Sequence, residues 1–320
     1  MTSLDENNEI KTTKDFLPEF SGLEANLVDL EKKKITVGGT TLHILAFRKD
    51  VNNKLRDKDF CDCLLETIID YVIPRSERNK VLGMTKRNFQ EISKLQKRAK
   101  SLFILNENSG EIGELILYYL TSQILETPQL ISKMSLKTNR NIPFHGADAI
   151  HFCLAKDEKT LEIFWGESKM HSDFNSAITG CLDGLSRYLI EMEDRNQRRE
   201  TDIGIILANS KSHLDDEHYS NLICSFLDKN NKNSLNLKFK GVGFVSCDTN
   251  SYNKILEIKN EDIESCIKRT FKEETLRWIK NTKSEIAKIP GLLDKDIYLF
   301  LIPFDSVSGF RRYFFEKFHE

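Results

Sequence analysis

The sequence predicts a mixed α and β fold, and two patterns support this. Residues 148–154 and 161–169 alternate apolar and polar side chains, as half-buried strands do. Residues 112–120 and 174–189 instead repeat apolar side chains at the i, i+3, i+4 spacing of amphipathic helices. The order of elements is mixed, without the strict βαβ repeat of a parallel sheet at its start. The 320 residues suffice for one large domain, or one domain with an appended lobe.

Composition and charge exclude several classes of protein. A formal net charge of −2 excludes a uniformly basic nucleic-acid coat, although a local basic groove remains compatible with it. The 39% hydrophobic and 30% charged residues are typical of a globular protein and exclude a wholly disordered chain. The seven cysteines form no CxxC pair, which predicts reduced thiols in a cytoplasmic protein. We expect neither a signal peptide nor a membrane span, because no apolar run fits either.

Charge is segregated along the first hundred residues. Residues 1–31 hold eight acidic and two basic side chains, and we predict a disordered acidic tail over residues 1–20. Residues 21–100 are predicted to form an N-terminal lobe. Within it, residues 75–100 hold nine basic and two acidic side chains, with helical spacing in the later part. This basic stretch is either a solvated helix face or a surface that contacts phosphate.

The remaining elements follow from turn and helix-stop signals. Gly38-Gly39 predicts the turn of a β-hairpin over residues 34–47, and Pro74 ends a helix predicted over 60–72. The continuous apolar run at 202–208 predicts a short strand buried on both faces. After it we predict, in order, a helix at 217–227, a strand at 241–247, a helix at 261–289, a strand at 297–302 and a helix at 307–318. The last helix carries aromatic side chains that either pack in the core or form a partner surface: Phe310, Tyr313, Phe314 and Phe318.

The end of the strand at 161–169 carries the candidate chemistry. Strand alternation puts Glu167 and Lys169 on one face, which is apolar until it reaches them. Charges at the edge of a core face are costly unless they are paired or bound to a metal. Asp148 begins the preceding strand, and a hairpin of this size would bring it beside Glu167. Either Glu111 or Glu114, on the helix before, could add a third carboxylate.

An Asp followed by Glu-x-Lys on a neighbouring strand is what metal-dependent phosphodiester cleavage needs. Two carboxylates bind a hard cation, Mg²⁺ with Mn²⁺ as a substitute, and the backbone carbonyl of Ser168 is placed to help. The metal polarises the phosphate and lowers the pKa of a bound water. Lys169 holds or deprotonates that water and offsets the developing charge. The alternative for Glu167 and Lys169 is a solvated ion pair worth about 0–1 kcal/mol.

Basic and histidine side chains near this site suggest contacts with DNA. A polar stretch leads into the site and supplies three cations without acidic neighbours in sequence: Lys133, Lys137 and Arg140. His171 follows Lys169 by two residues and is expected near phosphate. His145 and His151 flank Asp148, and His145 is either a metal ligand or a hydrogen-bonded loop residue.

Five segments resemble the HamA effector family of the bacterial Hachiman anti-phage system, which belongs to the PD-(D/E)xK, or restriction-endonuclease-like, superfamily. They are GEIGEL at 110–115, SKMSLKT at 132–138, HGAD at 145–148, WGESK at 165–169, and IPFDSV at 302–307 followed by Phe310-Arg311. The resemblance covers residues 35–320 and is weakest before residue 60. The proline of the superfamily's name is missing, since Gly146-Ala147 precede Asp148.

The resemblance implies an α+β fold with a restriction-endonuclease-like αβββαβ core, an N-terminal lobe and C-terminal additions, so that residues 101–320 form the nuclease domain. It implies Asp148, Glu167 and Lys169 as catalytic residues, with Glu114 as the helix carboxylate. It also implies Mg²⁺, DNA as substrate and a helicase partner, HamB. The implied function is a Mg-dependent deoxyribonuclease that serves as the effector of a defence complex. The alternative from another class is a non-catalytic DNA-binding or adaptor subunit of a helicase complex.

Overall fold

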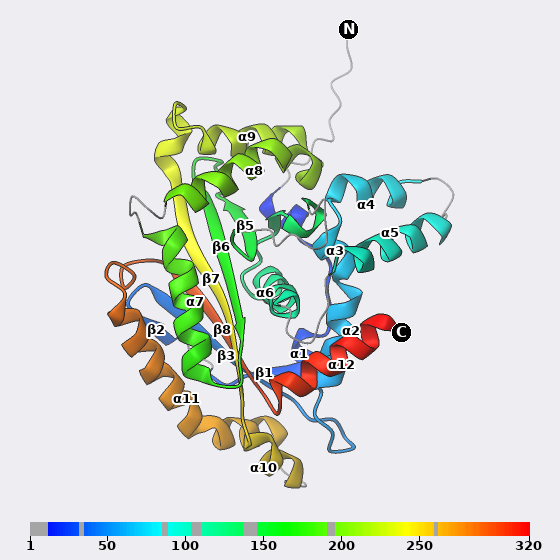
Figure 1. The fold of residues 1–320 in the computed structure, drawn as a ribbon, viewed down its shortest axis with the longest axis vertical. Coiled ribbons are helices and arrows are strands. Elements are labelled where there is room, and N and C mark those ends of the chain that lie inside the picture. The colour runs from blue at the N-terminus through cyan, green and yellow to red at the C-terminus, as the bar shows by residue number, and fades with distance from the viewer. Residues whose placement is uncertain are drawn as a thin grey trace.

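One mixed sheet forms the centre of the protein in a computed structural model. The structure describes residues 12–31, 35–84, 89–103, 110–136, 146–190, 196–258 and 262–320. Its strands are β1 (Leu27–Asp29), β2 (Ile35–Val37), β3 (Thr40–Phe47), β4 (Gln129–Ile131), β5 (Ala149–Leu154), β6 (Leu161–Met170), β7 (Leu237–Asp248) and β8 (Ile297–Phe304). Their order across the sheet is β1-β3-β8-β7-β6-β5-β4, with β2 also paired to β3 (Figure 1). The prediction of a mixed α and β fold is confirmed.

The half of the sheet that ends at β4 has the αβββαβ order that the resemblance implied. Helix α6 (Glu111–Ile124) is followed by the antiparallel strands β4, β5 and β6. Helix α7 (Phe174–Leu189) then leads to β7, which runs parallel to β6. Between α7 and β7 the chain inserts α8 (Asn196–Leu214), α9 (Glu217–Leu227) and the 3-10 helix η3 (Lys232–Asn236).

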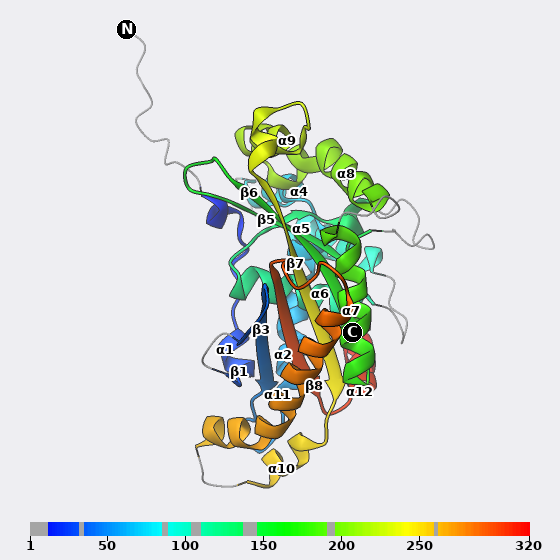
Figure 2. The ribbon, with the colours of Figure 1, turned by 90° about the vertical axis from the view of Figure 1, so that its left-hand side faces the viewer.

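Helices cover both faces of the sheet. Helices α7 and α11 (Ile263–Lys288) lie on one face, and Figure 2 shows them in front of the strands. Helix α6 lies on the other face, between the sheet and the helices α2 (Asp57–Glu66) and α3 (Ile68–Val72) (Figure 1). This central position explains why α6 is apolar nearly all round rather than along one stripe.

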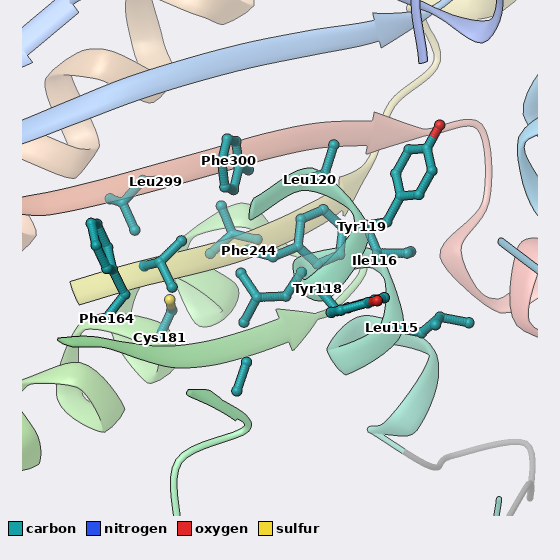
Figure 3. Close-up of a cluster of buried hydrophobic side chains, with 14 of the residues drawn as sticks. Leu115, Ile116, Tyr118, Tyr119, Leu120, Phe164, Cys181, Phe244, Leu299 and Phe300 are labelled. Atoms are coloured by element: carbon teal, nitrogen blue, oxygen red, sulfur yellow. The ribbon is translucent and has the colours of Figure 1, made fainter. Parts of the chain in front are cut away.

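The core on the α6 side is built from large side chains. Leu120 of α6, Phe244 of β7 and Phe300 of β8 lie in one cluster of side chains, and all three are fully buried (Figure 3). Burying a side chain of this size contributes about 1.5–3 kcal/mol relative to leaving it in water. Strands β5 and β6, and the helices on both faces of the sheet, therefore pack against one continuous hydrophobic core.

The N-terminal segment joins the same sheet. The predicted hairpin is confirmed, because β2 pairs antiparallel with β3 across the Gly38-Gly39 turn. Strand β3 also runs parallel to β8, so residues before position 60 extend the sheet of the core. A Cβ on Gly39 would lie 2.3 Å from the carbonyl oxygen of Lys295, so this close approach requires glycine. The helix predicted over 60–72 is instead α2 and α3, with the break at Thr67.

The predicted strand at 202–208 is wrong, because this segment belongs to helix α8. Asp202, Ile203 and Ile206 are buried, whereas Gly204 and Leu207 are exposed. That spacing is helical, and it continues to Ser210 and His213. A short apolar run does not distinguish a buried strand from a helix, since its periodicity is hidden when every residue is apolar.

The predicted elements after α8 are all confirmed in type. They are, in order, α9, β7, α11, β8 and α12 (Val307–His319). In α12 the side chains of Phe310, Phe314 and Phe318 are buried in the core. For these three phenylalanines the interpretation as a partner surface is therefore wrong and the core interpretation is right, whereas Tyr313 is only partly buried. The other elements are η1 (Thr13–Phe16), α1 (Leu23–Asn26), α4 (Arg75–Leu82), α5 (Phe89–Leu102), η2 (Lys133–Leu136) and α10 (Ser251–Glu257).

Part of the predicted acidic tail is folded. Residues 1–11 lie outside the described residues, but Thr13–Phe16 forms η1. The Phe16 ring packs edge-on against Phe152 and Tyr219, with ring centroids 6.0 and 4.8 Å apart. The Phe16 side chain thus packs this segment against the core. None of the helices in the described segments is long and apolar enough to cross a membrane.

Candidate active site

Asp148 is held where the ladder of β5 and β6 ends. Its N–H donates to the carbonyl oxygen of Gly166, at 2.9 Å, which fixes its backbone one residue before β5 begins. Its Oδ2 accepts hydrogen bonds from the N–H and the hydroxyl of Ser168, at 2.8 and 2.9 Å. The N–H and C=O of one strand residue point toward the same neighbouring strand. The Ser168 carbonyl therefore points to the side on which Asp148 lies.

Glu167 and Lys169 share a face, as strand alternation predicts. Their side chains form an ion pair that lies against α7. The exposed fraction is 13% for the Glu167 side chain and 32% for that of Lys169. A carboxylate this far out of water is not part of a solvated pair, so the alternative of a solvated strand end does not describe it.

Two glycines of α7 face this pair, and one of them, Gly184, makes room for it. A Cβ on Gly184 would lie only 2.4 Å from Cδ of Glu167, so the Glu167 side chain occupies the space that a side chain at position 184 would need. A Cβ on Gly180 would lie at an ordinary 3.5 Å from Cδ and Cε of Lys169. Glycine in a helix interior costs about 1 kcal/mol relative to alanine, so two of them four residues apart are a signal in the sequence. Sequence reasoning missed this signal.

The electrostatics of the site are those of two crowded acids and one cation. Burial, and then the charge of Asp148, raise the pKa of Glu167 to about 7, although Lys169 opposes the shift. Burial also raises the pKa of Asp148, against the hydrogen bonds from Ser168 and the charge of Lys169. Burial lowers the pKa of Lys169, but the charge and hydrogen bond of Glu167, together with the charge of Asp148, outweigh burial and leave that pKa raised. Lys169 is therefore an ammonium, suited to holding a water molecule rather than to deprotonating it.

This donor set fits a hard divalent cation. Asp148, Glu167 and the Ser168 carbonyl offer oxygen atoms, which Mg²⁺ and Mn²⁺ prefer. The raised pKa of Glu167 reflects a shortage of positive charge that a dication would relieve. In the part of the chain that the structure describes, however, no group of three His, Cys, Asp or Glu side chains is assembled to hold a metal.

The predicted third carboxylate has a different partner. The Tyr71 hydroxyl, from α3, donates to Oε2 of Glu114 at 3.2 Å. Glu111 is the more buried of the two acids at the start of α6. Burial raises the pKa of Tyr71, and the charges of Glu114, Asp148 and Glu111 raise it further. The acids of α6 thus lie around Tyr71, near Asp148 but outside a shared ligand set.

The predicted DNA-contacting residues divide into three groups. Lys133 is buried, and its ammonium lies 2.9 Å from both carboxylate oxygens of Asp202, so its position gives no support to a phosphate contact. Lys137 and Arg140, and likewise His145, lie outside the described residues. His171 is exposed just after β6.

Positive charge surrounds His171. Partial burial lowers its pKa, and the charges of Arg311 and Lys169 lower it further. Arg311, on α12, donates from Nη2 to the carbonyl oxygen of Met170 at 3.1 Å. In the sequence Arg311 was noted only as part of a motif, but the structure places it beside the end of β6.

His151 is a core residue rather than a ligand. Its Nδ1 lies 2.8 Å from the Thr127 carbonyl oxygen, to which it donates. Burial lowers its pKa to about 4, so the ring is neutral at pH 7. Its ring also packs against that of Tyr118 at 5.9 Å.

The chain has an αβββαβ core, with Asp148 before its second strand and Glu167 and Lys169 at the end of its third. This is the arrangement that the resemblance found in the sequence implied. The family model of HamA matches residues 24–318, and the chain belongs to the HamA family. It is thus a protein associated with Hachiman antiviral defence. No curated protein sequence matches the chain.

Proposed function

We propose that this protein is a metal-dependent deoxyribonuclease, the effector subunit of a cytoplasmic Hachiman defence complex. The observation that carries the proposal is the pairing of two crowded carboxylates, Asp148 and Glu167, with the ammonium of Lys169 at the end of β6. Strongly perturbed pKa values cluster at functional sites, because burial and crowded charges are what tune catalytic groups. Membership of the HamA family supports the defence role.

In this proposal each residue of the site has one role. Asp148, Glu167 and the Ser168 carbonyl hold Mg²⁺, for which Mn²⁺ substitutes. When bound, the cation polarises the scissile phosphate and lowers the pKa of a water molecule. Lys169 positions that water and offsets the negative charge that develops on the phosphate. Ser168 keeps Asp148 in place through its N–H and its hydroxyl.

Residues around the site complete the proposal. His171 and Arg311 lie beside Lys169 and would contact the DNA backbone, together with Lys137 and Arg140. Glu114, whose carboxylate accepts a hydrogen bond from Tyr71, would add a further oxygen ligand to the metal. A helicase subunit is proposed as partner on the strength of the family alone.

The test is degradation of plasmid DNA in Mg²⁺ by the wild-type chain and by Lys169→Ala, with and without the helicase subunit and ATP. We expect cleavage by the wild type and none by the variant. Lys238→Ala is the matched control, because Lys238 is exposed at the opposite end of the same sheet. Cleavage by Lys169→Ala at the wild-type rate would show that the site is assigned to the wrong residues.

One observation favours a second candidate, a non-catalytic DNA-binding or adaptor subunit. Glu114 is bound to Tyr71, and the described residues assemble no three-acid metal group. On this alternative the wild-type chain binds DNA and the helicase but leaves plasmid intact under every condition of the same assay.

A further inference from the structure

A buried ion pair lies directly behind the candidate active site. Lys133 of η2 and Asp202 of α8 are 69 positions apart in sequence, and the Lys133 ammonium contacts both oxygens of the Asp202 carboxylate at 2.9 Å. Exposed fractions of their side chains are 9% and 0%. A buried pair of this kind is often no more stabilising than two apolar side chains of similar volume. Its presence therefore invites an explanation other than stability.

The pair touches the backbone that leads into Asp148. Oδ2 of Asp202 accepts a hydrogen bond from the Ala147 N–H at 3.0 Å. A Cβ on Gly146 would lie 2.1 Å from Nζ of Lys133 and 2.6 Å from Oδ1 of Asp202. Residues 146 and 147 therefore rest on the ion pair, and the approach is close enough to require glycine at position 146.

Asp148 is consequently held from two sides. On one side its own N–H is bonded to Gly166 of β6. On the other side the preceding N–H, that of Ala147, is bonded to Asp202 of the inserted helix α8. We propose that Lys133 and Asp202 are positioning residues, which fix the backbone before Asp148 and thereby the place of its carboxylate in the metal site.

The two residues have distinct parts in this arrangement. Asp202 makes the hydrogen bond to Ala147, and Lys133 compensates the charge of a carboxylate that no water reaches. The inference rests on the proposed function, since it concerns the ligand that Asp148 is proposed to be. It also replaces a phosphate contact by Lys133 with a role that acts through Asp148.

Two double variants distinguish a role in positioning Asp148 from a role that only attaches helix α8 to the rest of the fold. Lys133→Met with Asp202→Leu removes both charges and the acceptor for Ala147 N–H. Lys133→Met with Asp202→Asn removes both charges and keeps an acceptor oxygen. Leu and Asn both keep the branched shape and the number of heavy atoms of the Asp202 side chain, so both variants should fold, which circular dichroism and thermal melting would establish. A control double variant, Lys240→Met with Glu162→Leu, removes a half-buried pair at the far end of β6.

The readouts are Mn²⁺ affinity by calorimetry and single-turnover DNA cleavage. Loss of a residue that orients a metal ligand typically costs about 10–100-fold in metal affinity or activity. We expect a loss of at least about tenfold in both quantities for the Leu double variant, with DNA affinity unchanged, and recovery of most of it in the Asn double variant. The control should match the wild type.

Each result decides the matter. A folded Leu double variant that binds Mn²⁺ and cleaves like the wild type would overturn the inference and leave the proposed function standing. Equal losses in the Leu and Asn variants would also overturn it, because the hydrogen bond to Ala147 would then be irrelevant. A wild type that neither binds Mn²⁺ nor cleaves would overturn the proposed function, and the inference with it. A double variant that does not fold would assign the pair to stability and likewise overturn it.

Discussion

In the absence of divalent metal, Glu167→Gln should stabilise the protein at neutral and alkaline pH but not at pH 4.5. The pKa of Glu167 is raised to about 7 from its ordinary 4.5, so ionising it in the folded state is unfavourable. Below pH 4.5 the carboxyl is neutral in both the folded and unfolded states, and it contributes no penalty. As the pH rises from 4.5 to 7, the unfolded state loses its proton first, and the folded state becomes progressively less stable.

The full penalty is present above pH 7. A pKa difference of this size corresponds to up to about 3 kcal/mol, because each pKa unit is worth about 1.4 kcal/mol. Glutamine carries no charge and removes the penalty. For a chain of this length, about 1 kcal/mol shifts the melting temperature by roughly 1.5 °C. The variant should therefore melt up to about 4 °C higher than the wild type at pH 8 in EDTA, and at the same temperature at pH 4.5.

The assay is thermal melting of both proteins at the two pH values, followed by addition of Mg²⁺ at pH 8. At ten times its dissociation constant, a bound ligand stabilises the folded state by about 1.4 kcal/mol. Mg²⁺ should therefore stabilise the wild type and leave Glu167→Gln nearly unchanged. The reasoning is refuted if the variant melts below the wild type at pH 8 in EDTA, or if the difference is the same at pH 4.5.

Two further predictions follow from the packing of the site. Gly184→Ala should lower Mn²⁺ affinity by about tenfold, because its Cβ would displace the Glu167 carboxylate. Gly180→Ala should bind Mn²⁺ normally and gain up to about 1 kcal/mol of helix stability. Calorimetry measures the affinities and thermal melting the stabilities, and equal affinities of the two variants would contradict the packing argument. Arg311→Glu should reduce DNA affinity in a filter-binding assay, because Arg311 lies beside the end of β6. Arg312→Glu, at an exposed position on the same helix, is the control and should leave DNA affinity unchanged. Equal effects of the two variants would show that the loss reflects net charge alone.

Most of the fold could be predicted because its elements are amphipathic. Strands β5 and β6 alternate in sequence, and helix α7 repeats apolar residues every three to four positions, so each pattern carries its own period. Strand β4 was missed because three residues are too few to show alternation. Helix α8 was misassigned because its apolar run conceals the period, which is visible only in the burial of Asp202 and Ile206 against the exposure of Leu207.

The candidate site was predictable in part. Glu167 and Lys169 lie two residues apart on one strand, so their shared face follows from strand geometry. Contacts between distant segments leave no such trace. The pairing of Lys133 with Asp202, and of Tyr71 with Glu114, depends on how helices from different parts of the chain pack together. Lys133 was therefore predicted from the sequence to contact phosphate, and in the fold it is paired with Asp202 in the interior.

Binding of a divalent cation by Asp148 and Glu167 together is the central claim, and isothermal titration calorimetry with Mn²⁺ tests it most directly. The account predicts saturable binding at pH 8 by the wild-type chain, and its loss both in Asp148→Asn and in Glu167→Gln, each of which keeps the size of the side chain. Lys238→Ala should bind as the wild type does. A wild type that takes up no Mn²⁺, or two variants that bind it with unchanged affinity, would contradict the account.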